Sequence, residues 1–292
     1  MRVIDFRLRP PSRAFLDMVM YSQIDRTERM ARGIGFTLPA SVRERSFDLM
    51  LEEMDEANVS YGVVPGRISP VLGTIEADDI AAIVAMKPDR LAGYAGIDVV
   101  DGRKAIAAVD SARKNGMKGV VIEPGLSSTP MHLDDPRMYP IYAHCQAAQM
   151  PVLFMAGGNA GPDVTYTSPE HIDRVARDFP DLKIISGHGN WPWAAQIIHV
   201  CYRRPNIWLS PDMYIFGGLS GAQDYVNAAN GFMADRFLFG TAYPLLPFKD
   251  GVEAFLKFPL KESVIDKLLY KNAAELLGLD DASAGVRSSS AA

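Results

Sequence analysis

The chain has 292 residues, of which 48% are hydrophobic and 22% are charged, and 30 Lys and Arg stand against 35 Asp and Glu. This is the composition of a folded globular protein, and a net charge of -5 gives no general attraction to nucleic acid or to an anionic membrane. The first residues do not resemble a signal peptide and no run of about 20 apolar residues occurs, so a cytoplasmic location is expected.

Eight short apolar runs, rich in Val and Ile and bounded by Gly or Pro, predict the strands of a parallel sheet that is buried on both faces. They cover residues 2–8, 61–65, 91–97, 117–122, 150–155, 183–186, 206–210 and 236–240. From the second run onward, each is separated from the next by the length of one crossover helix and two loops. The pattern predicts an α/β fold, a closed (β/α)8 TIM barrel, over residues 1–280. An open doubly wound sheet is the alternative, but no glycine-rich dinucleotide turn follows the first run.

Two segments depart from this repeat. Residues 10–41 form an insertion after the first strand, and because active sites of barrels lie at the C-terminal rim, this insertion is a candidate lid or oligomer contact, or a plain surface excursion. Residues 281–292 are small and polar without a period, which predicts a flexible C-terminal tail.

The first strand carries two arginines on one face. Since side chains alternate along a strand, Arg7 and Arg9 lie on the same side as Asp5, and this side is expected to face the barrel mouth. A buried guanidinium needs an anionic partner. The partner is either a substrate carboxylate or phosphate, or a protein carboxylate from among Asp5, Glu123 and Asp212.

Five segments resemble the amidohydrolase-related (amidohydrolase 2) family, in the order in which that family has them. They are Val3–Pro10, Pro151–Gly157, Leu182–Pro192, Phe237–Pro244 and Leu268–Gly278. The resemblance implies a TIM barrel that acts as a hydrolase or carboxy-lyase on a small carboxylic acid or lactone, and it implies a homo-oligomer.

The resemblance also implies a metal site, which this sequence does not keep. The family binds a divalent metal through two His on the first strand, one His each on the fifth and sixth strands, and an Asp on the eighth. Those positions hold Arg7, Arg9, Met155, His188 and Ala242 here. Arginine and apolar side chains do not complete a metal shell, so no metal cofactor is expected. A zinc site made of His188, Glu123 and Asp212 is the alternative.

The remaining polar groups at strand ends suggest the chemistry. His188 can give and take a proton near neutral pH, and Glu123 and Asp212 are candidates for a second acid or base or for partners of Arg7 or Arg9. With Arg7 and Arg9 as the anion anchor, the residues expected to bind a carboxylate substrate are Arg67, Asn190, Trp191, Tyr214 and Tyr243. Trp193 is expected to be a packing residue. The alternative function is a catalytically silent barrel that binds a small anion.

Overall fold

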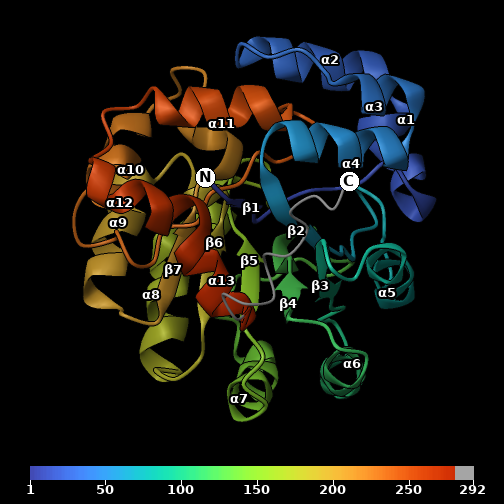
Figure 1. Cartoon of the computed structure of the whole chain (residues 1–292). Helices are drawn as coiled ribbons and strands as arrows, with labels where there is room; N and C mark the ends of the chain where they lie inside the picture. The colour runs from blue at the N-terminus through green and yellow to red at the C-terminus, as the bar shows by residue number, and fades with distance from the viewer. Residues whose placement is uncertain (280–292) are drawn as a thin grey trace.

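The computed structural model describes residues 1–279, and its centre is a curled parallel sheet (Figure 1). Within these residues seven strands are assigned, each paired in parallel with the next along the chain. They are β1 (Val3–Asp5), β2 (Val59–Pro65), β3 (Leu91–Gly96), β4 (Gly119–Ile122), β5 (Val152–Met155), β6 (Ile184–Gly187) and β7 (Ile207–Ser210). The predicted tail at residues 281–292 lies outside the described residues.

Side chains on the two faces of the sheet belong to separate buried clusters. Ile4, Val63, Val121, Leu153 and Ile185 pack together in one cluster. Their neighbours at alternate positions belong to the larger cluster, which includes the apolar faces of the helices. This alternation is what a barrel requires, because one face of every strand points inward and the other towards the surrounding helices. It agrees with the predicted α/β barrel.

The eighth predicted strand, residues 236–240, does not form a regular ladder. It makes an isolated parallel bridge to β7 between Leu209 and Phe237, in which Leu209 N donates to the Arg236 carbonyl and Leu238 N donates to the Leu209 carbonyl, both at 2.9 Å. On its other side the Phe6 amide donates to the Phe239 carbonyl, also at 2.9 Å. This segment therefore links β7 to the residues after β1, but with too few successive pairs to be assigned as a strand.

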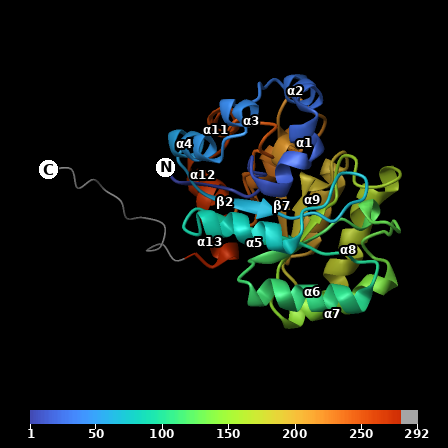
Figure 2. The same cartoon turned by 90° about the vertical axis from the view of Figure 1, so that its right-hand side faces the viewer.

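The helices surround the sheet (Figures 1 and 2). After the insertion they are α4 (Phe47–Glu56), α5 (Ala77–Met86), α6 (Gly102–Lys114), α7 (Tyr139–Ala147), α8 (Pro169–Asp178), α9 (Ala194–Arg203), α10 (Ala222–Ala229), α11 (Phe248–Leu256), α12 (Glu262–Asp266) and α13 (Asn272–Leu277). Local capping fixes some of their starts: Ser46 Oγ accepts the Leu49 amide at the start of α4, and Asp101 accepts two amides at the start of α6. Across residues 1–279, no helix combines the length and the apolar character needed to cross a membrane.

The insertion at residues 10–41 is itself helical. It contains the 3₁₀ turn η1 (Arg13–Asp17), α1 (Val19–Ser22), α2 (Ile24–Gly33) and the beginning of α3 (Ala40–Glu44). These helices lie together at one side of the molecule, next to α4, in both views (Figures 1 and 2). Met18 and Tyr21 are buried against the rest of the protein, so the segment is packed and is not a plain surface loop.

Candidate active site

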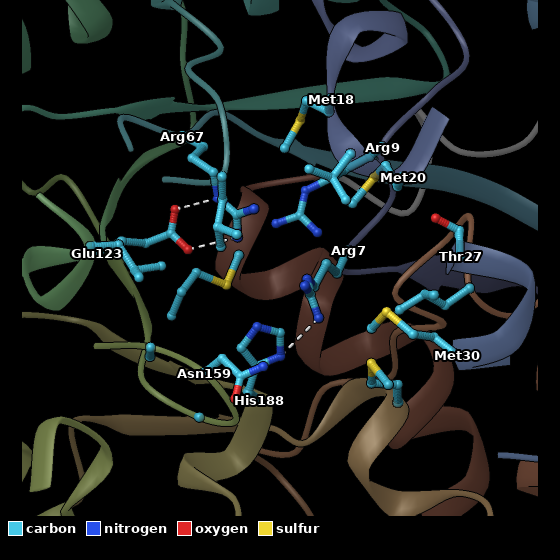
Figure 3. A pocket seen from close by; sticks show the side chains of 18 of the residues that line it. Arg7, Arg9, Met18, Met20, Thr27, Met30, Arg67, Glu123, Asn159 and His188 are labelled. Carbon is cyan, nitrogen blue, oxygen red and sulfur yellow. Dashed lines mark hydrogen bonds and ion pairs between the residues drawn. The ribbon is translucent and has the colours of Figure 1, made fainter. Parts of the chain in front are cut away.

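A cavity of about 160 Å³ lies where the carboxyl ends of the strands meet the insertion (Figure 3). Six residues expected at the site form part of its wall: Arg7, Arg9, Arg67, Glu123, His188 and Tyr214. They come from the segments after β1, β2, β4, β6 and β7. The barrel thus brings together groups that are far apart in sequence, at the rim where barrel enzymes have their active sites.

Arg7, His188 and Asp212 form a buried cluster. Arg7 Nη1 lies 2.8 Å from His188 Nδ1 and donates to Asp212 Oδ2 at 2.8 Å. Asp212 also accepts the amide of His188 at 3.2 Å and that of Met213 at 2.6 Å. Burial alone would raise the pKa of Asp212, but the charge of Arg7 and its hydrogen bond, together with the contact with His188, outweigh it, so the pKa is lowered. Asp212 is therefore ionised and is the internal partner of Arg7.

Nδ1 of His188 lies between a donor and an acceptor, 2.8 Å from Arg7 Nη1 and 2.9 Å from Asp212 Oδ2. A guanidinium can only donate, so the contact with Arg7 is a hydrogen bond in the tautomer with its proton on Nε2, whereas the contact with Asp212 is one in the tautomer with its proton on Nδ1. Burial and the positive charge of Arg7 lower the pKa of His188, which keeps the ring neutral. In the described part of the chain, Nε2 has no hydrogen-bond partner. In the tautomer with its proton on Nε2, the neutral imidazole can donate a hydrogen bond to a bound ligand.

Arg67 and Glu123 form a second buried pair. Arg67 Nε and Nη2 donate to the two oxygens of Glu123 at 2.7 and 2.8 Å, in the forked geometry that suits a carboxylate. Burial would raise the pKa of Glu123, but the charge and hydrogen bonds of Arg67 lower it. Strand β3 lies between β2, which precedes Arg67, and β4, which precedes Glu123, and it ends at Gly96. A Cβ atom on Gly96 would lie 2.7 Å from the Arg67 amide nitrogen, so the glycine allows the backbone of Arg67 to lie close to the end of β3. Of the alternatives left open for Glu123, pairing with Arg7 or Arg9 is not seen here, because both of its oxygens accept hydrogen bonds from Arg67.

Arg9 differs from the other two arginines because it has no anionic partner. Its side chain is directed into the cavity (Figure 3), and the residue is only 2% exposed. Its Nε and Nη2 atoms are buried and find no hydrogen-bond partner among residues 1–279. Burial, and then the charges of Arg7 and Arg67, lower the pKa of Arg9 well below its ordinary value. The Arg9 guanidinium is thus a buried cation for which no hydrogen bond to a carboxylate is found among residues 1–279.

Asp5 lies behind the arginines and does not neutralise them through its side chain. It accepts the backbone amide of Arg7 at 2.9 Å, and the amide and hydroxyl of Thr241 at 3.2 and 2.5 Å. Burial raises the pKa of its carboxyl group from 3.8 to about 7, although these hydrogen bonds oppose the shift. Its role is to join β1 to the eighth segment of the barrel.

Three residues expected to bind the substrate do not lie in the cavity wall. Asn190 is buried and bonds to Ser186 Oγ and to the Thr167 carbonyl. Trp191 stacks on the outer side of the cavity residue Tyr214, with ring centroids 5.1 Å apart, and donates to the Ser220 carbonyl. Tyr243 stacks on Phe248 at 4.5 Å, and its hydroxyl bonds to Ser41 Oγ. These side chains support the cavity wall and do not form it. Trp193, expected to pack, bonds through Nε1 to Thr167 Oγ1.

The sequence reasoning missed the apolar wall of the cavity. Five methionines belong to it: Met18, Met20, Met30, Met155 and Met213. The first three come from the insertion, as does Arg26, while Asn159 lies in the loop after β5. The position of residues 10–41 near the rim was a usable signal, but which of its side chains face inward depends on how the short helices dock.

The donors at the family's metal positions do not fit a divalent cation. Arg7 and Arg9 bring positive charge to two of these positions, and Met155 and Ala242 offer no suitable oxygen or nitrogen at two others. The alternative set of His188, Glu123 and Asp212 is not arranged as a metal site either. Over the described residues, no group of three or more His, Cys, Asp or Glu has such a geometry. Glu123 is held by Arg67, and Asp212 is held by Arg7.

Comparison with known proteins identifies the family. Residues 31–279 match the amidohydrolase 2 family of amidohydrolases. The crystal structure of an uncharacterized TIM-barrel protein from Bordetella bronchiseptica is 48% identical, with a TM-score of 0.92 over 98% of this chain and 100% of that one. None of the curated proteins compared with the chain matches it.

More distant structures share the fold. 2,6-Dihydroxybenzoate decarboxylase from Rhizobium is 15% identical, with a TM-score of 0.71 over 96% of this chain and 99% of its own. A dihydroxybenzoic acid decarboxylase from Polaromonas, with bound manganese and the inhibitor 2-nitroresorcinol, is 17% identical, with a TM-score of 0.70 over 95% of this chain and 97% of its own. The family match covers most of the sequence and the TIM-barrel fold agrees with it, so this chain belongs to the amidohydrolase family.

Proposed function

We propose that the protein is a hydrolase or carboxy-lyase that acts on a small carboxylate or lactone without the family's usual divalent metal. The observation that carries this proposal is the cavity wall itself, where buried arginines and a neutral histidine stand at positions that bind metal in the family. Decarboxylases among the structural neighbours support the kind of reaction.

The groups in the wall divide the work between binding and proton transfer. The guanidinium groups of Arg7 and Arg9 provide a positive potential that attracts the substrate carboxylate and stabilises negative charge as it develops. Once its ring has taken up a proton and become imidazolium, His188 donates the Nε2 proton and returns to neutral imidazole. The acceptor is either the carbanion left by loss of CO₂ or, when a water molecule attacks the carbonyl carbon of a lactone, the leaving oxygen of the opening ring. Asp212 keeps Arg7 in place, and Glu123 keeps Arg67 in place. The methionines of the insertion supply part of the apolar wall of the cavity.

The test is a screen of small aromatic and unsaturated carboxylates and lactones, with two readouts. Release of CO₂ reports carboxy-lyase activity, and release of acid at constant pH reports lactone hydrolysis. Replacing His188→Gln is expected to lower kcat by about 10²- to 10⁴-fold, the usual contribution of a general acid or base. Ligands that bind but are never converted would instead establish the silent anion-binding barrel.

Metal independence is tested on the same activity. Untagged protein purified without chelator is analysed for metals, and its turnover is measured before and after exhaustive chelation. Unchanged turnover is expected. Loss of turnover that zinc or manganese restores would refute the metal-free part of the proposal. We also propose that the protein forms a homo-oligomer, which light scattering would detect, and that its ligand is a small carboxylate.

A further inference from the structure

The buried charges around the cavity do not balance. Three guanidinium groups, those of Arg7, Arg9 and Arg67, are each at most 6% exposed. Two carboxylates with lowered pKa values, Asp212 and Glu123, pair with Arg7 and Arg67 respectively. Arg9 is left over, and Figure 3 shows it among the apolar side chains of the insertion with no acceptor beside it. Asp5, whose pKa is raised to about 7, carries only part of a negative charge at neutral pH and bonds to Thr241 and to the Arg7 amide, so the cation without a carboxylate partner is Arg9.

The backbone prevents Arg9 from moving its charge to solvent at low cost. Its amide donates to the Tyr243 carbonyl at 3.1 Å, and its carbonyl accepts the Tyr21 hydroxyl at 2.6 Å. Both neighbours are buried, so the residue is fixed between the barrel and the insertion. A buried, unpaired charge is strongly unfavourable, and an anion that enters the cavity removes that penalty.

We propose that Arg9 alone holds the carboxylate of the ligand, that the buried cavity accepts one negative charge, and that Arg7 acts on His188 as a positioning residue. The proposal rests on the proposed function only in taking the ligand to be a carboxylate. It separates two arginines that the strand pattern treats as equivalent. Arg7 already contacts Asp212 and His188 through Nη1, whereas Nε and Nη2 of Arg9 are buried without a hydrogen-bond partner in the described residues.

The apolar side chains of the cavity wall indicate what the part of the ligand beyond its carboxylate is like. Met18, Met20 and Met30 approach from the insertion, and Met155 and Met213 approach from the barrel. Thioether side chains adapt to flat apolar groups and contact aromatic rings favourably. A cavity of about 160 Å³ has the size that accommodates one such ring. Benzoate is therefore a suitable probe, with benzamide as its uncharged match and isophthalate as its two-carboxylate match.

The experiment compares the full-length wild type with Arg9→Met and Arg7→Met by thermal denaturation, with and without these three probes. Without ligand, Arg9→Met is expected to raise Tm by several degrees, because it removes an uncompensated buried charge. Arg7→Met is expected to lower Tm, because it leaves Asp212 without its cationic partner. Benzoate is expected to raise the Tm of the wild type and of Arg7→Met, but not that of Arg9→Met. Benzamide is expected to have no effect on any of the three.

Each part of the inference has its own refutation. If Arg9→Met lowers Tm in the absence of ligand, Arg9 stabilises the fold and is not an unpaired charge. If benzoate raises the Tm of Arg9→Met as it does that of the wild type, or does not raise the Tm of the wild type, Arg9 is not the anion site. Isophthalate binding tenfold tighter than benzoate would refute the single charge, with Arg26 at the cavity as the second cation. These outcomes need no turnover, so they stay distinct from a failure of the proposed reaction.

The positioning role of Arg7 is read from the imidazole itself. Nitrogen NMR of the wild type is expected to show His188 as the neutral tautomer protonated on Nε2. In Arg7→Met, Nδ1 becomes free to donate to Asp212, which lies 2.9 Å away, so the ring is expected to bind a proton more tightly and to be protonated on Nδ1. Arg7→Lys is expected to restore part of the wild-type spectrum. A His188 tautomer that is the same in wild type and Arg7→Met would refute this role.

Discussion

The buried pair of Arg7 and Asp212 permits a quantitative test of how strongly this site is desolvated. In Asp212→Asn the shape of the side chain is kept, but Arg7 loses the carboxylate that lies 2.8 Å from its Nη1 atom. The Asp212 side chain is fully buried and that of Arg7 is 6% exposed, so water cannot replace the lost charge. Breaking such a pair by removing one partner costs about 3–5 kcal/mol. At about 2 °C per kcal/mol for a chain of this length, Tm is expected to fall by about 6–10 °C.

The matched control is the same substitution in an exposed pair. Asp235 lies 2.6 Å from Lys267 Nζ, but its side chain is 75% exposed, and Asp235→Asn is expected to cost no more than about 1 kcal/mol. Urea unfolding followed by circular dichroism gives both free energies, and equal m-values would show that the two variants expose the same surface on unfolding. Equal losses in Asp212→Asn and Asp235→Asn would refute the claim that the cavity charges are desolvated.

Three further outcomes follow from the same site. Between about pH 4 and 7, Asp5 holds a proton in the folded state that it has lost in the unfolded chain. The free energy of unfolding, measured by urea titration, is therefore expected to decrease by up to about 4 kcal/mol as the pH rises through this range, and Asp5→Asn is expected to abolish the decrease. Arg67→Met is expected to lower the free energy of unfolding by about 3–5 kcal/mol, because it leaves the Glu123 carboxylate buried without its partner. The double variant Arg67→Met/Glu123→Leu is expected to regain most of this stability, and a double variant no more stable than Arg67→Met would show that the loss comes from packing. Gly157→Ala would place a Cβ 2.5 Å from His188 Cβ, so turnover is expected to fall with a loss of stability of about 1–3 kcal/mol, which activity and urea assays would measure together.

The fold was predictable because the apolar runs are strong signals and because each strand is buried on both faces. Seven of the eight predicted runs are strands, with ends that differ by a few residues. The run at residues 236–240 was predicted on apolar content, but its pairing depends on where the chain enters and leaves the barrel. A ladder needs several successive pairs with a neighbour, and composition does not report that number.

The site was predictable only where strand periodicity continues. Arg7 and Arg9 continue the alternation of β1 beyond its last residue, and both line the cavity. Just after the strands the alternation stops, because His188, Asn190 and Asp212 have positive φ values of 62°, 51° and 45°. A residue in the left-handed region turns the backbone, so the direction of the next side chain no longer follows from its place in the sequence. This is why Asn190 points into the protein while His188 lines the cavity.

The difference between Arg7 and Arg9 depends on a carboxylate that this chain lacks. Ala242 stands where the family has a metal-binding Asp, and it is buried next to Tyr243, which bonds to the Arg9 amide. Its φ of 54° suits Asp and Asn, so either residue fits the backbone. Ala242→Asp would add a buried negative charge one residue before Tyr243, whose carbonyl accepts the Arg9 amide, and it is expected to weaken benzoate binding at least tenfold in calorimetric titrations. Ala242→Asn is the neutral control and is expected to bind benzoate as the wild type does. If both variants bound benzoate equally, the affinity of the cavity for anions would not arise from an unpaired arginine.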